Sequence, residues 1–240
     1  MAQTKATGMT PERLATLLRY LLVVVIGLDL VLIVVRVLLY TPFLGQQGAL
    51  IFLIEPVVLL LVYGSIVVFA TTNLDPDRLI ALRQGAVVGL ITGTMWVVNL
   101  ALETFADLSG SANLLATAPF LLGAFVLWGV AGGRVVWQSG SLGGGILAAV
   151  WAGMVCVLIT ITFGFLLTYT SLPRLEQMLA TDPDFIRSHW ADLRAFAIAN
   201  SFDSAFSHLL GTLLIGTIIG VSGSLVGLFL SGLWRRQSVP

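Results

Sequence analysis

Long apolar stretches separated by short polar segments make up most of the chain. Each is about as long as the roughly 20 residues that an α-helix needs to cross the hydrocarbon core of a bilayer. The stretches are longer than strands and do not alternate between polar and apolar residues, so they are predicted to be helices. Six stretches qualify, over residues 17–40, 49–70, 84–105, 113–136, 144–169 and 206–233. The pattern therefore predicts an all-α polytopic integral membrane protein, a six-transmembrane-helix bundle that forms a single membrane domain over residues 1–240.

Three polar segments share the chemistry of a helix start, in which a capping side chain is followed by proline and then by an acid. They are Thr10-Pro11-Glu12, Asp75-Pro76-Asp77 and Asp182-Pro183-Asp184. The first two predict that the first and third spans begin in water and run directly into the membrane. The third predicts a helix within the long segment before the last span.

That long segment, residues 170–205, is predicted to hold one extracytoplasmic amphipathic helix of about 15–18 residues. The apolar residues that recur at helical spacing after the proline are Ile186, Trp190, Leu193 and Ala197. We expect Asn200-Ser201 to end this helix, and Asp203 or Ser204 to cap the last span. The helix is a connector lying on the membrane surface or, alternatively, a lid over a pocket that opens outward.

Composition narrows the class of protein further. Apolar residues make up 58% of the chain and charged residues only 10%, with 12 acidic and 12 basic side chains. Mean hydropathy is +1.00. A water-soluble fold of this size has too little interior to bury so much apolar surface. The composition excludes a soluble enzyme and a disordered protein, and the absence of a basic excess excludes a nucleic-acid binder. The lipid bilayer is the expected partner.

The distribution of basic residues predicts the orientation in the membrane. They lie in the amino-terminal tail, between the second and third spans, between the fourth and fifth, and after the sixth: Lys5, Arg13, Arg19, Arg78, Arg83, Arg134, Arg235 and Arg236. The short segments on the opposite side, residues 41–48 and 106–112, carry none. The positive-inside rule places both termini in the cytoplasm, with residues 1–16 as a cytoplasmic tail. Eleven of the 12 basic residues are arginine, a bias that favours a bacterial inner or plasma membrane.

Small residues recur every four positions in several spans. Because helices do not associate hydrophobically in lipid, such rows allow close backbone approach and predict helix packing. The packing residues are Gly85, Gly89 and Gly93, then Gly145, Ala149 and Gly153, and finally Gly216 and Gly220. A surface that slides during a transport cycle is the functional alternative.

Three charged residues lie inside the first two spans, where each costs roughly 2.5–3.5 kcal/mol without a partner. They are Asp29, Arg36 and Glu55. In a hairpin of the first two helices the depths of Arg36 and Glu55 differ by about 2–3 Å, which predicts an ion pair. Asp29 lies about 10 Å from Arg36 along the axis, too far for a direct bridge, and is the least compensated charge.

Asn99 and Glu103 in the third span lie at similar or slightly shallower depth. Together with the three charges they predict a polar pocket between the first three helices that opens outward. The set has three interpretations: a structural ion pair, a solute, ion or proton site, or a contact with a partner subunit.

Other chemistry is sparse. Cys156 is the only cysteine, and His189 and His208 are too few and too far apart for a metal site, so no metal and no cofactor are expected. Gly220-Val221-Ser222-Gly223 is similar to the nucleophile motif of rhomboid intramembrane proteases. The nearby His208 lies about 21 Å away along the same helix, out of reach of a base for that serine.

The sequence favours a non-catalytic accessory, scaffold or partner-binding module that acts with a membrane-protein partner or as a homo-oligomer. The alternative is a small solute or ion permease, and an intramembrane enzyme is the least favoured. The two main hypotheses differ in whether the buried charges lie beside a cavity.

Overall fold

The computed structural model describes residues 11–72, 75–106 and 111–237 of the chain. Within these ranges the protein is helical, without strands, and six of its helices are long and apolar enough to cross a membrane. The prediction of an all-α, six-span membrane protein is confirmed. Thr10 and Lys5, with most of the predicted tail, lie outside the described residues, as do the side chains of Glu12, Arg235 and Arg236.

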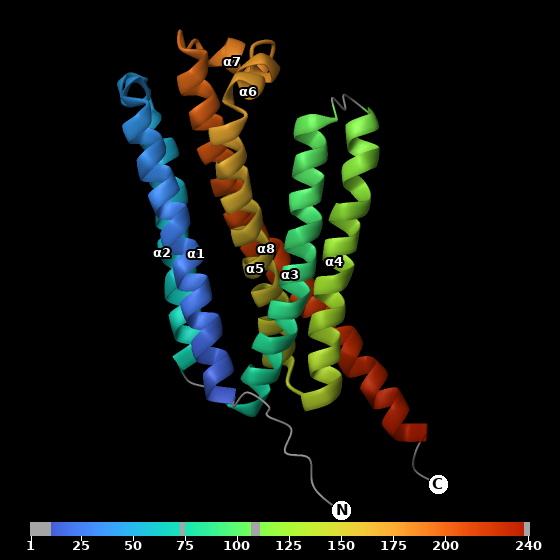
Figure 1. Cartoon of the computed structure of the whole chain (residues 1–240). Coiled ribbons are helices and arrows are strands. Elements are labelled where there is room, and N and C mark those ends of the chain that lie inside the picture. The colour runs from blue at the N-terminus through green and yellow to red at the C-terminus, as the bar shows by residue number, and fades with distance from the viewer. Residues whose placement is uncertain (1–10, 73–74, 107–110, 238–240) are drawn as a thin grey trace, which may run out of the picture.

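The six spans belong to the helices α1, α2, α3, α4, α5 and α8, which together form one bundle (Figure 1). Their bounds are Pro11–Leu39, Ala49–Thr72, Pro76–Phe105, Ser111–Ser139, Leu142–Thr170 and Leu193–Gln237. A short 3-10 helix, η1 (Thr41–Gly45), joins α1 to α2. Two short helices, α6 (Leu172–Leu179) and α7 (Pro183–Ser188), join α5 to α8.

Both termini emerge at one end of the bundle, which we call the terminal end (Figure 1). The opposite end carries η1, α6 and α7, and we call it the cap end. α5 is the most buried span and packs against α3, α4 and α8 on one side and against α1 on another. The α1–α2 hairpin therefore lies apart from the α3–α4 hairpin, with α5 and α8 between them. This arrangement decides which polar residues can meet.

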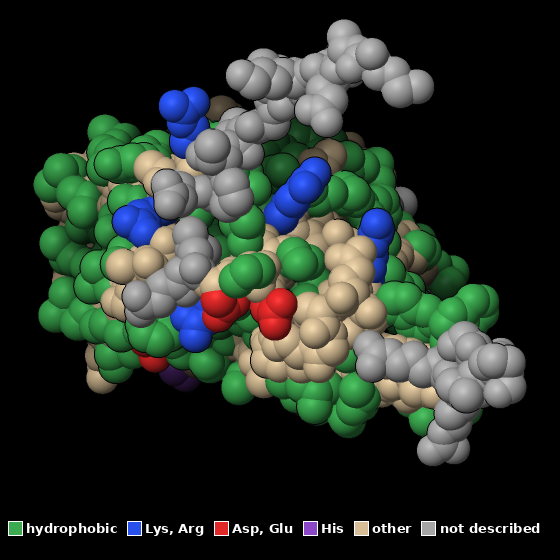
Figure 2. Space-filling model, turned by 90° about the horizontal axis from the view of Figure 1, so that it is seen from below, with side chains coloured by type: hydrophobic (Ala, Val, Ile, Leu, Met, Phe, Trp, Pro, Cys, Tyr) green, Lys and Arg blue, Asp and Glu red, His purple; other side chains and the backbone are tan. Residues whose placement is uncertain are grey.

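Arginine side chains are spread over the face seen from the terminal end (Figure 2). The described helix ends at this face carry Arg13, Arg19, Arg78, Arg83 and Arg134. Arg19 donates to the hydroxyl of Thr71 at 2.8 Å and also to the Thr71 carbonyl, which ties the start of α1 to the end of α2.

The aspartates of two predicted helix starts cap their helices. The Asp75 carboxylate accepts from the backbone N–H of Arg78 at 2.7 Å, and the Asp182 carboxylate accepts from that of Asp184 at 2.7 Å. In each case proline occupies the first turn, where it needs no amide hydrogen. Both predicted caps are confirmed.

The predicted amphipathic helix of 15–18 residues is wrong. α7 ends at Ser188 because His189 adopts a left-handed backbone conformation, with φ of 56°. The chain then turns, and α8 begins at Leu193 with Asp192 accepting from the Ala195 N–H at 3.0 Å. Neither Asn200-Ser201 nor Asp203 interrupts α8, which runs without a break for 45 residues.

Glycine rows bring the backbones of α3, α4, α5 and α8 together in the terminal half of the bundle. A Cβ atom on Gly89 would lie 2.6 Å from the Ala152 carbonyl oxygen of α5. Gly85 faces the Ala148 carbonyl of α5, and Gly93 faces Ile159 and Cys156 of the same helix. Gly145 faces α4 and α8, Gly153 faces Thr212 of α8, and Gly216 and Gly220 face α5 near Ala149. At these glycines the helices are too close for larger side chains, although a groove of about 550 Å³ lies between α4 and α8 in the same half.

Candidate functional site

The cap-end half of the same helices holds a cavity of about 270 Å³. α3, α5 and α8 form its walls, and Leu175 and Leu179 of α6 border it toward the cap end. Asn99 and Glu103 line it on α3, whereas Asp29, Arg36 and Glu55 do not. The prediction of a pocket between the first three helices is therefore wrong. α5 packs against both α1 and α3, so it separates the charged residues of α1 and α2 from Asn99 and Glu103.

Glu103 and Asn99 form a hydrogen-bonded pair one helical turn apart on α3. The Asn99 amide nitrogen donates to Oε1 of Glu103 at 2.9 Å, and the Thr117 hydroxyl of α4 donates to the same oxygen at 2.7 Å. Asn99 is 1% exposed, and its Oδ1 has no hydrogen-bond partner in the described part of the chain. The pair thus leaves one buried acceptor at the cavity without a donor.

Hydroxyl groups line the cavity opposite this pair, on α5 and α8. Thr160, Thr168 and Ser201 each donate to a carbonyl oxygen of their own helix, at 2.7–2.9 Å. Thr104 does the same on α3, at 2.8 Å. Because a hydroxyl has only one hydrogen, these groups turn oxygen lone pairs rather than hydrogens toward the cavity.

His208 of α8 borders the cavity at its deep end. Its Nδ1 lies 2.7 Å from the Ser204 carbonyl oxygen, which can only accept, so Nδ1 carries a hydrogen. Nδ1 therefore cannot take a proton from the Ser204 hydroxyl, which lies 3.4 Å away, and the two do not form a nucleophile–base pair. In a neutral ring Nε2 remains as a further acceptor.

A second cavity of about 230 Å³ continues from the first toward the terminal end. Trp96, Thr160 and His208 line both cavities, so the two are neighbours. Phe125 and Trp128 bring aromatic rings to the second cavity, and the Trp128 ring N–H donates to the Thr92 hydroxyl at 3.2 Å. Cys156 also lines it. We call the two cavities together the cleft.

Asp29 lies on the other side of α5, fully buried and outside the cleft. The Thr162 hydroxyl of α5 lies 2.7 Å from its Oδ1, and its Oδ2 has no hydrogen-bond partner in the described ranges. Asp29 therefore has a neutral partner on α5 rather than a charged one.

The predicted ion pair between Arg36 and Glu55 is wrong. Arg36 points to α5, where it donates to the Thr168 carbonyl at 3.1 Å and lies 4.9 Å from the centre of the Tyr169 ring. Glu55 is half-buried and makes no ion pair with any described residue. Arg36 and Glu55 have similar depth, but depth does not fix direction: α1 packs against α5 as well as α2, and Arg36 lies on the side toward α5.

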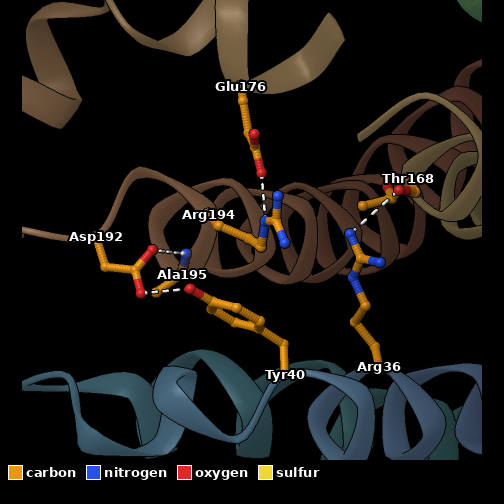
Figure 3. A network of polar contacts seen from close by, with 7 residues as sticks. All are labelled: Arg36, Tyr40, Thr168, Glu176, Asp192, Arg194 and Ala195. Carbon is orange, nitrogen blue, oxygen red and sulfur yellow. Dashed lines mark hydrogen bonds and ion pairs between the residues drawn. The ribbon is translucent and has the colours of Figure 1, made fainter. Parts of the chain in front are cut away.

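A polar network connects the helix ends at the cap end, near Arg36 (Figure 3). The Tyr40 hydroxyl donates to Asp192 at 2.6 Å, and Arg194 forms an ion pair with Glu176 at 2.6 Å while lying 5.5 Å from the centre of the Tyr40 ring. The network joins the α1–α2 hairpin to α6 and α8. Phe52 of α2 adds an edge-on ring contact with Trp190 at 6.0 Å.

The electrostatics of this network favour an ionised Asp192. Desolvation alone would raise the pKa of Asp192, but the hydrogen bonds from Tyr40, Ala195 and Arg194 and the charge of Arg194 outweigh it, so the pKa lies below its usual value. The hydrogen bond to Asp192, followed by desolvation, raises the pKa of Tyr40. The network is therefore fully formed when Asp192 is ionised and Tyr40 is protonated.

Sequence reasoning missed most of the residues that line the cleft on α5 and α8. The signal was present, because Asn200, Ser204 and His208 recur every four residues, and so do Thr160, Gly164 and Thr168. Each row marks one polar face of a helix. Ser222 of the protease-like motif is not part of the cleft, and its hydroxyl donates to the Ile218 carbonyl at 2.9 Å.

Comparisons of the chain with protein-family models, with curated proteins and with solved structures find no match.

Proposed function

We propose that this protein is a small permease-type membrane protein that binds a solute in the cleft between α3, α5 and α8. The observation that carries the proposal is the position of the cleft. It occupies the cap-end half of the bundle and ends where the glycine rows bring α5 against α3 and α8. A cavity confined to one half of a membrane-spanning bundle, with close helix contacts in the other half, is an arrangement that suits alternating access.

The orientation follows from the arginines at the terminal end. The positive-inside rule favours both termini in the cytoplasm of a bacterial inner or plasma membrane. The cap end then faces the outside, and the solute enters past α6. The proposal involves binding and passage without covalent chemistry.

Cysteine accessibility tests whether the cleft contains water and from which side. Cys156, the only cysteine, is replaced by alanine, and Ser204→Cys is added in the cleft. The matched control is Val98→Cys, which lies beside Asn99 on α3 but is exposed on the bundle surface. Intact cells are treated with small membrane-impermeant thiol reagents, one cationic and one anionic.

We expect labelling of Ser204→Cys by at least one reagent from outside, and no labelling of Val98→Cys in the lipid. Absence of labelling at Ser204→Cys from either side of the membrane would overturn the proposed cleft. The accessory or scaffold function, which needs no water-filled cavity, would then be favoured. Labelling from the cytoplasmic side only would overturn the orientation.

A further inference from the structure

We infer that the cleft binds a small organic cation with N–H donors, such as a primary ammonium group on a short apolar chain. This assignment rests on the proposed function and deepens it by naming the class of solute. It depends on three properties of the cleft: its charge, its hydrogen-bond acceptors and its aromatic end.

Glu103 is the only acidic or basic side chain, apart from His208, among the described residues that line the two cavities. Its Oε1 receives both of its hydrogen bonds, from Asn99 and Thr117, and its Oε2 receives none from the described residues. No described lysine or arginine forms an ion pair with it. A bound cation would supply the missing charge, whereas a bound anion would meet this carboxylate.

The polar lining offers several acceptors, although Asn200 and Trp96 also bring N–H donors to it. Asn99 Oδ1 is buried beside the cavity and has no hydrogen-bond partner among the described residues, and a buried acceptor without a donor is costly. The hydroxyls of Thr160, Thr168 and Ser201 donate their hydrogens to backbone carbonyls. An ammonium group has three donors and no acceptor, which complements such a lining.

The deep end of the cleft suits an apolar group. Trp96 lies between the two cavities, and Phe125 and Trp128 line the inner one. Aromatic faces attract cations and also bury alkyl chains. A bare metal ion fits less well, because the described residues contain no cluster of three or more His, Cys, Asp or Glu that could hold one.

The assignment is tested on the purified full chain in lipid nanodiscs by isothermal titration calorimetry. The probes are butylammonium and butyrate, which share an alkyl chain and differ in charge, then tetramethylammonium, which lacks N–H donors, and sodium chloride alone. Glu103→Gln removes the charge of the cleft and keeps the side-chain shape. Glu55→Gln is the matched control, because it removes an intramembrane glutamate outside the cleft.

We expect butylammonium to bind, tetramethylammonium to bind more weakly, and butyrate not to bind. Glu103→Gln should raise the Kd for butylammonium about tenfold or more, and Glu55→Gln should leave it unchanged. Equal binding of butyrate, an unchanged Kd in Glu103→Gln, or binding of sodium in place of butylammonium would overturn the assignment.

The two proposals fail separately. If Ser204→Cys is labelled but butylammonium does not bind, the class of solute is wrong and the water-filled cleft remains. If Ser204→Cys is not labelled, the proposed function itself fails.

Discussion

The two halves of the bundle are built from the same four helices and differ in what lies between them. In the terminal half, glycines of α3, α4, α5 and α8 meet neighbouring backbones. In the cap-end half, these helices carry Asn, Thr, Ser, His and Trp side chains around the cleft. Because helices in lipid approach as closely as their interface side chains allow, this change of residue type brings α5 against α3, α4 and α8 in one half and leaves room for the cleft in the other.

The polar groups that line a cavity also need hydrogen-bond partners. Most cleft hydroxyls bond to carbonyls of their own helices, so the cleft does not depend on bonds across it. The bond from Thr117 to Glu103 is an exception that joins α3 to α4. The cleft can thus stay open without leaving many polar groups unsatisfied.

The largest change in stability is expected from substitutions at the glycine contacts of the terminal half. Replacing both Gly85 and Gly89 by alanine puts Cβ atoms against backbone carbonyls of α5, which cannot move aside as side chains can. We expect the free energy of unfolding, measured by titration with sodium dodecyl sulfate, to fall by about 4 kcal/mol.

The matched control for this double variant replaces Gly27 and Gly64, where a Cβ atom meets nothing within 4 Å. Alanine should there be neutral or stabilise slightly, because it is the better helix former. Equal effects of the two double variants would show that close approach does not hold the terminal half together.

A smaller loss of stability is expected from a substitution on the side of α5 that faces away from the cleft. Thr162→Val removes the hydroxyl at Oδ1 of Asp29 and leaves a fully buried carboxyl group with no hydrogen-bond partner among the described residues. The free energy of unfolding should fall by about 2 kcal/mol.

Adding Asp29→Leu to Thr162→Val should restore most of that loss, since the unsatisfied group is then gone. If both variants also leave labelling at Ser204→Cys unchanged, the buried acid is structural and separate from the cleft. No loss in Thr162→Val alone would contradict the importance of the contact.

The smallest effect concerns the cap end and its dependence on pH. The folded state lowers the pKa of Asp192 below the ordinary value of 3.8. Its contribution to stability is therefore complete above that value and is lost as the pH falls through the lowered pKa. Because Asp192 is only partly buried, the loss should be less than about 1 kcal/mol.

The measurement is the thermal midpoint between pH 6 and pH 2 for the wild type and for Tyr40→Phe. The variant lacks one of the hydrogen bonds that lower the pKa of Asp192, so its midpoint should depend less on pH over the acid range. An identical pH profile would mean that the Tyr40–Asp192 bond does not stabilise the cap end.

The spans and two of the helix caps could be predicted because both depend on local sequence. Apolar length identifies a membrane helix, and an aspartate before proline caps a helix whatever surrounds it. The direction of Arg36 could not be predicted, because the apolar residues of α1 are spread around the helix and do not define one packing face. Similar depth in the membrane indicates Glu55 as the partner of Arg36, but in the structure Arg36 contacts α5.

The break between α7 and α8 at the cap end also could not be predicted from local sequence. Ile186, Trp190, Leu193 and Ala197 keep helical spacing across the turn, so their pattern is that of one helix. The break depends on a left-handed residue, and His189 is not glycine, the usual residue for that conformation. The cleft required a further fact, that α8 lies beside α3 and α5, which no local pattern contains.

The length of α8 has a further structural consequence. At 45 residues it is about 68 Å long, more than twice the thickness of the hydrocarbon core, and it runs without a break from the cap-end network to the last described residue. Gly216 and Gly220 cross α5 partway along it, where the two backbones are close. Gly223 and Gly227, farther along α8, meet Gly129 and Gly133 of α4. One continuous helix therefore connects the polar network at the cap end with the glycine contacts of the terminal half.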